Sequence, residues 1–147
     1  MEKPKKWFKE LYEILPYQEI FSNEEIKITR KVQITRKDIS IQDEPIIEYN
    51  LDLFVFDSKS NREIASFIFF TVRLNDPPKK YMLDLVNLQK FCNLLKDKID
   101  KENINSIKEM LKEDMIYMLR YAEVEEKAIE KLLENFEKSY NNYSGLN

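Results

Sequence analysis

The chain has 147 residues, of which 43% are hydrophobic and 35% are charged, and a formal net charge of −3. This length supports one hydrophobic core, and the mixture of charges describes a solvated surface, which disfavours a general binder of polyanions. We therefore expect a single domain over residues 1–140, followed by a disordered tail over residues 141–147.

Most familiar active sites need residues that this chain lacks. It has no histidine, one cysteine (Cys92) and one glycine (Gly145). A phosphate-binding loop requires glycines, and most catalytic triads and catalytic metal centres use imidazole. A lone cysteine forms neither an internal disulfide nor a zinc cluster, and Cys92 lies at an apolar position of a predicted helix. We therefore predict a protein that is not an enzyme and that holds no cofactor and no metal ion.

The distribution of apolar residues also bears on location. No apolar run approaches the roughly 18 residues of a membrane span, and the first residues lack the apolar stretch of a signal peptide. Together with the absence of a cysteine pair, this predicts a cytoplasmic protein that does not contact a membrane.

The N-terminal segment has the pattern of a short amphipathic helix over residues 4–15. Pro4 suits a first helical turn, and Trp7 and Leu11 recur at helical spacing. Pro16 prevents the helix from continuing.

From Ile26 the apolar period changes to two, which is typical of a strand with one buried face. The buried face carries Ile26, Ile28, Val32 and Ile34. The polar face carries Lys27, Thr29, Lys31, Gln33, Thr35 and Lys37. The alternation slips after Arg36, so we expect a bulge, bend or turn there, and a loop over residues 43–45.

Two runs rich in β-branched and aromatic residues, 46–57 and 62–74, flank turn-forming residues and predict a β-hairpin. With Asp57 opposite Arg62, one face lines the core and pairs Val55 with Ile64, Leu53 with Ser66, Leu51 with Ile68, Tyr49 with Phe70 and Ile47 with Val72. The opposite face then carries Phe54, Phe56, Phe67 and Phe69 near the turn.

Three helical patterns follow the break at residues 75–78. The first runs from Leu85 to Ile99 with Asp84 or Asn87 as its N-cap, the second begins near an Asn103 cap, and the third extends from Val124 to Tyr140. Residues 81–86 could instead form a short fourth strand. The expected fold is α+β, with an N-terminal helix, a three-stranded antiparallel meander and three C-terminal helices packed on the sheet.

A basic strand is one candidate binding surface. The sequence Ile-Thr-Arg-Lys occurs twice, six residues apart, and an even spacing on a strand places equivalent residues on one face. Such a row could follow a phosphate backbone, although no aromatic residue alternates with these cations along the strand. Opposite charges on the neighbouring strand explain the same residues structurally. The candidate residues are Lys27, Arg30, Lys31, Arg36 and Lys37.

The aromatic face of the hairpin is the second candidate surface. Phe54, Phe56, Phe67 and Phe69 must be covered, either by the chain's own helices or by a partner, because apolar surface of this size is costly in water. A partner could also dock on the last helix, whose acidic residues are Glu123, Glu125, Glu126, Glu130 and Glu134. A solvated outer face explains these acids equally well.

A carboxylate site is the third candidate. Its residues are Glu48, Asp52, Asp57 and Lys59, which would support metal-dependent hydrolysis. Asp57-Ser58-Lys59 superficially resembles the acidic-x-Lys element of some metal-dependent nucleases, in which carboxylates hold Mg²⁺ and a lysine orients the water. Asp57 and Lys59 fall in the predicted turn, however, and Asp52 and Asp57 differ in strand parity. A solvated hairpin tip explains them more simply.

The leading hypothesis is a non-enzymatic interaction module, a small adaptor, inhibitor or assembly subunit, that binds another protein or a second copy of itself. A regulatory protein of a virus or mobile element would suit this size and composition. The alternative is a nucleic-acid-binding protein that uses the basic strand.

Overall fold

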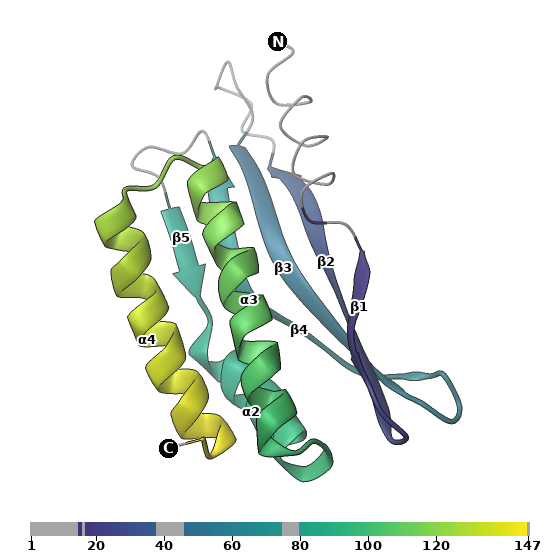
Figure 1. Cartoon of the computed structure of the whole chain (residues 1–147). Helices are drawn as coiled ribbons and strands as arrows, with labels where there is room; N and C mark the ends of the chain where they lie inside the picture. The colour runs from purple at the N-terminus through teal and green to yellow at the C-terminus, as the bar shows by residue number, and fades with distance from the viewer. Residues whose placement is uncertain (1–14, 16, 38–45, 75–79, 147) are drawn as a thin grey trace.

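The computed structural model describes residue 15 and residues 17–37, 46–74 and 80–146, without the side chains of residues 34–37, 46, 47, 74 and 80. Within these ranges, five strands precede three helices (Figure 1). The elements are β1 (Gln18–Ser22), β2 (Ile26–Lys37), β3 (Ile46–Asp57), β4 (Glu63–Leu74), β5 (Lys80–Leu83), α2 (Leu85–Lys98), α3 (Lys101–Tyr121) and α4 (Glu126–Ser144). The strands form one antiparallel sheet in sequence order.

The predicted three-stranded meander is wrong, because β1 and β5 extend the sheet to five strands. β1 has five residues and a register shift between Glu19 and Phe21, so its alternation is too short and irregular to read from sequence. β5 has four residues and leads through Asp84 into α2. The predicted helix over residues 4–15 lies outside the described residues except for Leu15, which is buried.

The predicted β3–β4 hairpin is confirmed. Asp57 N donates to Arg62 O at 2.8 Å, which places these residues opposite each other. Asn61 adopts a positive φ of 58°, a conformation that asparagine tolerates better than most residues. β2 pairs with β3 in one unbroken register from Ile26 opposite Asp57 to Lys37 opposite Ile46.

Two bulges in β4 make the predicted side-chain pairing wrong. The first leaves Ile64 unpaired, so Val55 lies opposite Ala65 and Leu53 opposite Phe67. The second falls at Phe69, between the Asp52–Ile68 and Leu51–Phe70 pairs. A one-residue slip moves each following side chain to the other face, which turns Phe67 inward.

Side-chain caps mark the starts of α2 and α3, and a glycine marks the end of α4. Asp84 caps α2 by accepting a hydrogen bond from Asn87 N. Asp84 is one of the two N-cap residues predicted for this helix. Asp100, rather than the predicted Asn103, caps α3, and Asn103 N is the donor. α4 continues to Ser144, four residues into the segment predicted as a tail, and ends at Gly145 in a left-handed conformation.

The core lies between one face of the sheet and the layer of helices (Figure 1). Three ring pairs join the two layers at centroid distances between 5.7 and 6.0 Å: Phe67 with Phe91 of α2, Phe69 with Phe136 of α4, and Tyr49 with Tyr121 of α3. The buried Tyr140 hydroxyl donates to Ile104 O at 2.7 Å, and burial raises the pKa of Tyr140. Among the described helices, none is both long and apolar enough to cross a bilayer.

Candidate functional site

The three described helices cover one side of the sheet (Figure 1), and we call the other side the outer face. Its side chains alternate along the strands with the buried side chains that pack under the helices. The outer face comprises Lys27, Thr29, Lys31 and Gln33 of β2, Glu48, Asn50, Asp52, Phe54 and Phe56 of β3, and Ser66, Ile68, Thr71 and Arg73 of β4.

Lysines and phenylalanines of neighbouring strands meet on the outer face. Lys27 Nζ lies 5.1 Å from the centroid of the Phe56 ring, and Lys31 Nζ lies 5.6 Å from that of Phe54. Lys27 Nζ also donates to Asn61 Oδ1 at 2.9 Å. Each cation–ring contact contributes roughly 0.5–1 kcal/mol at exposed positions. The aromatic partners that β2 lacks along its own sequence therefore come from β3.

The outer face becomes polar away from the hairpin tip. Arg73 Nε donates to Glu48 Oε1 at 3.1 Å, and Thr71 Oγ1 donates to Asn50 Oδ1 at 2.8 Å. Asp52 is buried, and burial raises its pKa to about 6 although nearby Lys31 lowers it. The cross-strand polar partners expected for β2 are present, since Lys31 lies opposite Asp52. The outer face thus joins an aromatic half to a hydrogen-bonded polar half.

The four phenylalanines predicted as one binding surface divide between the two sides of the sheet. Phe54 and Phe56 lie on the outer face and are partly buried. Phe67 and Phe69 lie in the core, where Phe69 is fully buried and stacks on Phe136 at an interplanar angle of 19°. The expectation of a shared face is wrong because the β4 bulges reverse the orientation of Phe67 and Phe69.

The five basic residues predicted as one nucleic-acid surface are also separated. Arg30 faces the helices, where its Nε lies 3.1 Å from Asp114 Oδ2 of α3 and its Nη2 donates to Gln18 Oε1 at 2.9 Å. Burial raises the pKa of Asp114 to about 6, and Arg30 partly offsets this increase. Arg30, predicted to act together with the row of Lys27, Lys31 and Lys37, therefore lies on the opposite face of β2 from Lys27 and Lys31. It occupies a core-facing position of β2 because its charge has a partner on α3.

The other basic candidates have mixed positions. Lys27 and Lys31 lie on the outer face, whereas the side chains of Arg36 and Lys37 lie outside the described residues. In the backbone register, Arg36 is opposite Ile47 and Lys37 is opposite Ile46.

The predicted carboxylate set does not converge. Glu48 pairs with Arg73, Asp52 lies within the outer face, and Asp57 lies at the hairpin turn. Asp57 Oδ2 accepts from both the N–H and the hydroxyl of Ser60 at 2.8 Å, and these bonds lower the pKa of Asp57. In the ranges that the structure covers, no group of three or more His, Cys, Asp or Glu side chains could hold a metal ion.

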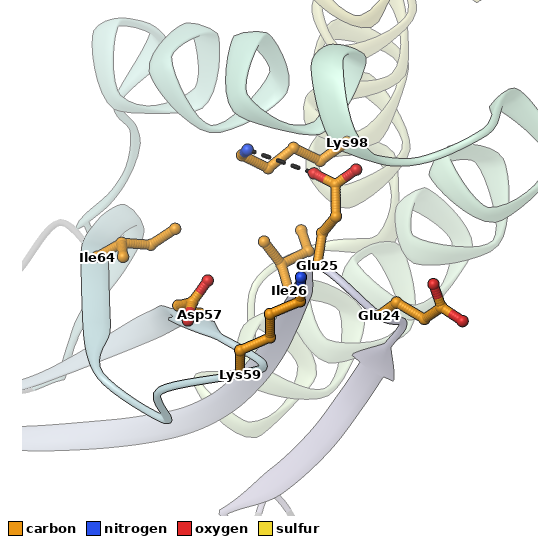
Figure 2. Close-up of a pocket in the computed structure, with 7 residues that line it drawn as sticks. All are labelled: Glu24, Glu25, Ile26, Asp57, Lys59, Ile64 and Lys98. Atoms are coloured by element: carbon orange, nitrogen blue, oxygen red, sulfur yellow. Dashed lines mark hydrogen bonds and ion pairs between the residues drawn. The ribbon is translucent and has the colours of Figure 1, made fainter.

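A small cavity of about 130 Å³ lies where the β1–β2 and β3–β4 turns approach the end of α2 (Figure 2). It is lined by Glu24, Glu25, Ile26, Asp57, Lys59, Ile64 and Lys98. Lys98 Nζ reaches Glu25 Oε2 at 3.5 Å, whereas Glu24 points away from the other labelled side chains (Figure 2). Asn23 Nδ2 donates to Lys98 O at 3.1 Å, and Ser58 Oγ donates to Asn23 O at 2.8 Å. These contacts hold the two turns against α2, and we assign the cavity a structural role.

The acids predicted as a docking surface surround the start of α4. Glu126 accepts two bonds from Arg120, at 3.0 and 3.2 Å, while Glu130 and Glu134 are exposed. Cys92 is buried, and burial raises the pKa of its thiol to about 12, which suits the predicted structural role and not a reactive one.

No protein-family model, curated protein or solved structure matches this chain.

Proposed function

We propose that this protein is a non-enzymatic interaction module that binds a partner protein through the outer face. The observation that carries the proposal is the position of Phe54 and Phe56. All three described helices pack on the opposite side of the sheet (Figure 1). The rings of Phe54 and Phe56 are only partly buried. Partly exposed aromatic rings beside a hydrogen-bonded polar region are typical anchors of protein interfaces.

The charges of the outer face favour a protein over a polyanion. Lys27 and Lys31 lie over the rings, but Glu48 and Asp52 occupy the adjoining part of the same face. A protein surface can match charges of both signs, whereas a phosphate backbone would be repelled by the acids. In this proposal the ammonium groups of Lys27 and Lys31 pair with carboxylates of a partner whose apolar side chains contact the rings.

Single-stranded nucleic acid is the second candidate, and the alternation of cations with rings favours it. Bases can stack on aromatic side chains while nearby lysines contact phosphates. The burial of Arg30 against Asp114 removes one of the five candidate cations from this surface, however. We therefore place nucleic acid behind a protein partner.

Affinity capture with matched variants tests the proposal. Three proteins are immobilised: the wild type, the double variant Phe54→Asp/Phe56→Asp and the control Tyr117→Asp. Tyr117 serves as the control because it is 55% exposed on α3, away from the outer face. We expect the wild type and the control to capture the same partner protein. When each variant is mixed with the purified partner, the affinity of the double variant should be at least tenfold lower than that of the wild type. Circular dichroism is measured for all three proteins, and only variants with the wild-type spectrum are compared. Equal affinity of the three would refute binding through the outer face.

A salt titration separates the second candidate from the first. Binding of a labelled single strand should weaken steeply with added salt and fall further in Lys31→Glu if nucleic acid is the ligand. We expect no such binding, because acids share the surface with Lys31.

A further inference from the structure

Asp52 is a buried acid of the outer face without a fixed partner. Its exposed fraction is 4%, and no described residue donates a hydrogen bond to its carboxylate or forms an ion pair with it. Thr29, its diagonal neighbour on β2, is also buried, and the Thr29 hydroxyl has no hydrogen-bond partner among the described residues. The other acid of the outer face, Glu48, is held by Arg73 Nε at 3.1 Å. The charge of Asp52 is therefore poorly compensated, whereas that of Glu48 is neutralised by its partner.

Lys31 is the cation that the β2–β3 register places against Asp52. The two residues lie directly opposite each other, which brings their Cβ atoms to about 5 Å. Lys31 Nζ nevertheless lies over the Phe54 ring, 5.6 Å from its centroid, and forms no ion pair with Asp52. The flexible lysine side chain can turn toward either group. The position of the Lys31 charge is therefore coupled to the charge of Asp52.

The surroundings of Asp52 favour its neutral form. Burial raises the pKa of Asp52 from 3.8 to about 6, although Lys31 of β2 lowers it, and Glu63 of β4 raises it further. The paired Glu48 and Arg73 are the charged groups farther along the same face of β3 and β4. A carboxyl in this setting changes its charge close to neutral pH, whereas an ordinary aspartate is ionised there.

We propose that Asp52 makes the affinity of the outer face for anionic groups depend on pH. The ionised carboxylate attracts the Lys31 ammonium, and the neutral acid leaves this ammonium to an anion that binds beside the rings of Phe54 and Phe56. The inference rests on the proposed use of the outer face, and it adds a means by which acidification strengthens binding.

The direction of the effect follows from proton linkage. An anion bound beside Phe54 draws Lys31 away from Asp52 and adds negative charge nearby. Both changes raise the pKa of Asp52 in the complex above its value in the free protein. Binding therefore takes up a proton, and affinity increases as the pH falls toward the pKa of the free protein.

A fluorescence titration with anilinonaphthalene sulfonate tests the inference without a protein partner. This probe combines aromatic rings with a sulfonate that stays ionised at all the pH values used. We expect the wild type to bind it at least about threefold more tightly near pH 5.5 than near pH 8, because binding takes up a proton. Asp52→Asn should keep the tighter affinity at both pH values, since its side chain is always neutral. Asp97→Asn, which changes an exposed residue of α2, should behave as the wild type does.

Three results of this titration would overturn the inference. The first is the same pH dependence in the wild type and in Asp52→Asn. The second is the absence of binding by the wild type near pH 5.5. The third is full binding by Phe54→Asp/Phe56→Asp, which would place the anion away from the outer face.

A nuclear magnetic resonance titration of the Asp52 carboxyl carbon tests its coupling to Lys31. We expect a midpoint near pH 6 in the wild type and a higher midpoint in Lys31→Gln, because Lys31 lowers the pKa of Asp52. A wild-type midpoint near the ordinary value of 3.8, or an unchanged midpoint in Lys31→Gln, would contradict the inference.

The inference and the proposed function can fail separately. Equal partner affinity of the wild type and Phe54→Asp/Phe56→Asp would refute binding of a protein through the outer face, and the two titrations would still measure the effect of Asp52. A partner that requires Phe54 and Phe56 but binds the wild type equally well near pH 5.5 and pH 8 would leave the proposed function standing and refute control by Asp52.

Discussion

Replacing Phe69 with alanine should destabilise the protein far more than replacing Phe54, although both belong to the phenylalanine set of one hairpin. Phe69 is fully buried, and its ring stacks on Phe136 with a centroid distance of 5.9 Å. Removing such a ring from a core costs about 3–5 kcal/mol. Phe54 is partly buried and contacts Lys31, so its loss should cost about 1 kcal/mol.

Urea unfolding measures the difference directly. A slope of roughly 1–3 kcal/mol per M of urea converts the expected loss for Phe69→Ala into a midpoint lowered by at least about 1 M. A wild-type unfolding free energy of roughly 5–15 kcal/mol would leave Phe69→Ala folded in water for most values in that range, because the substitution removes only about 3–5 kcal/mol. Phe54→Ala should move the midpoint by less than half as much. Equal shifts, or a larger shift for Phe54→Ala, would refute the positions assigned through the β4 bulges.

Three further predictions concern buried polar groups and a helix cap. The pKa of Asp114 is raised from 3.8 to about 6, so the folded state retains its proton at a higher pH than the unfolded state, and stability should fall between about pH 4 and pH 6. For the wild type, the unfolding free energy should fall by at most about 3 kcal/mol over this pH range, and for Asp114→Asn it should fall by less. Equal declines for the two proteins in urea unfolding at several pH values would exclude Asp114 as the cause. Asp100→Ala should lower stability by about 1 kcal/mol because it removes the α3 cap, whereas the exposed Asp97→Ala should leave the thermal midpoint nearly unchanged. Tyr140→Phe should cost roughly 1–3 kcal/mol in urea unfolding, because Ile104 O loses its buried donor, and a neutral result would argue against that hydrogen bond.

The features that could be predicted from the sequence are those with strong local patterns. The helices have regular apolar spacing, and residues that include Leu88, Leu95, Leu111 and Met115 are buried as expected. The β3–β4 hairpin has turn residues between two β-branched runs, which locate it without tertiary information. These signals depend only on neighbouring residues.

The features that were missed depend on contacts between distant parts of the chain. The β4 bulges at Ile64 and Phe69 have no glycine or other local mark, yet they decide which phenylalanines are buried. Arg30 has the strand parity of the buried face, but its partner there, Asp114, is far away in the sequence and left no local signal. The pairing of Lys27 with Phe56 could have been found only from the β2–β3 register. Long-range pairing therefore determined the candidate site more than local pattern did.

Hydroxyl-radical footprinting of the captured complex tests the central claim most directly. The measurement compares side-chain oxidation rates in the free protein and in the complex with its partner. If the partner binds the outer face, Phe54 and Phe56 should be protected while the exposed Tyr117 on α3 keeps its free rate. Protection of Tyr117, with Phe54 and Phe56 unchanged, would place the partner on the helices and contradict the account.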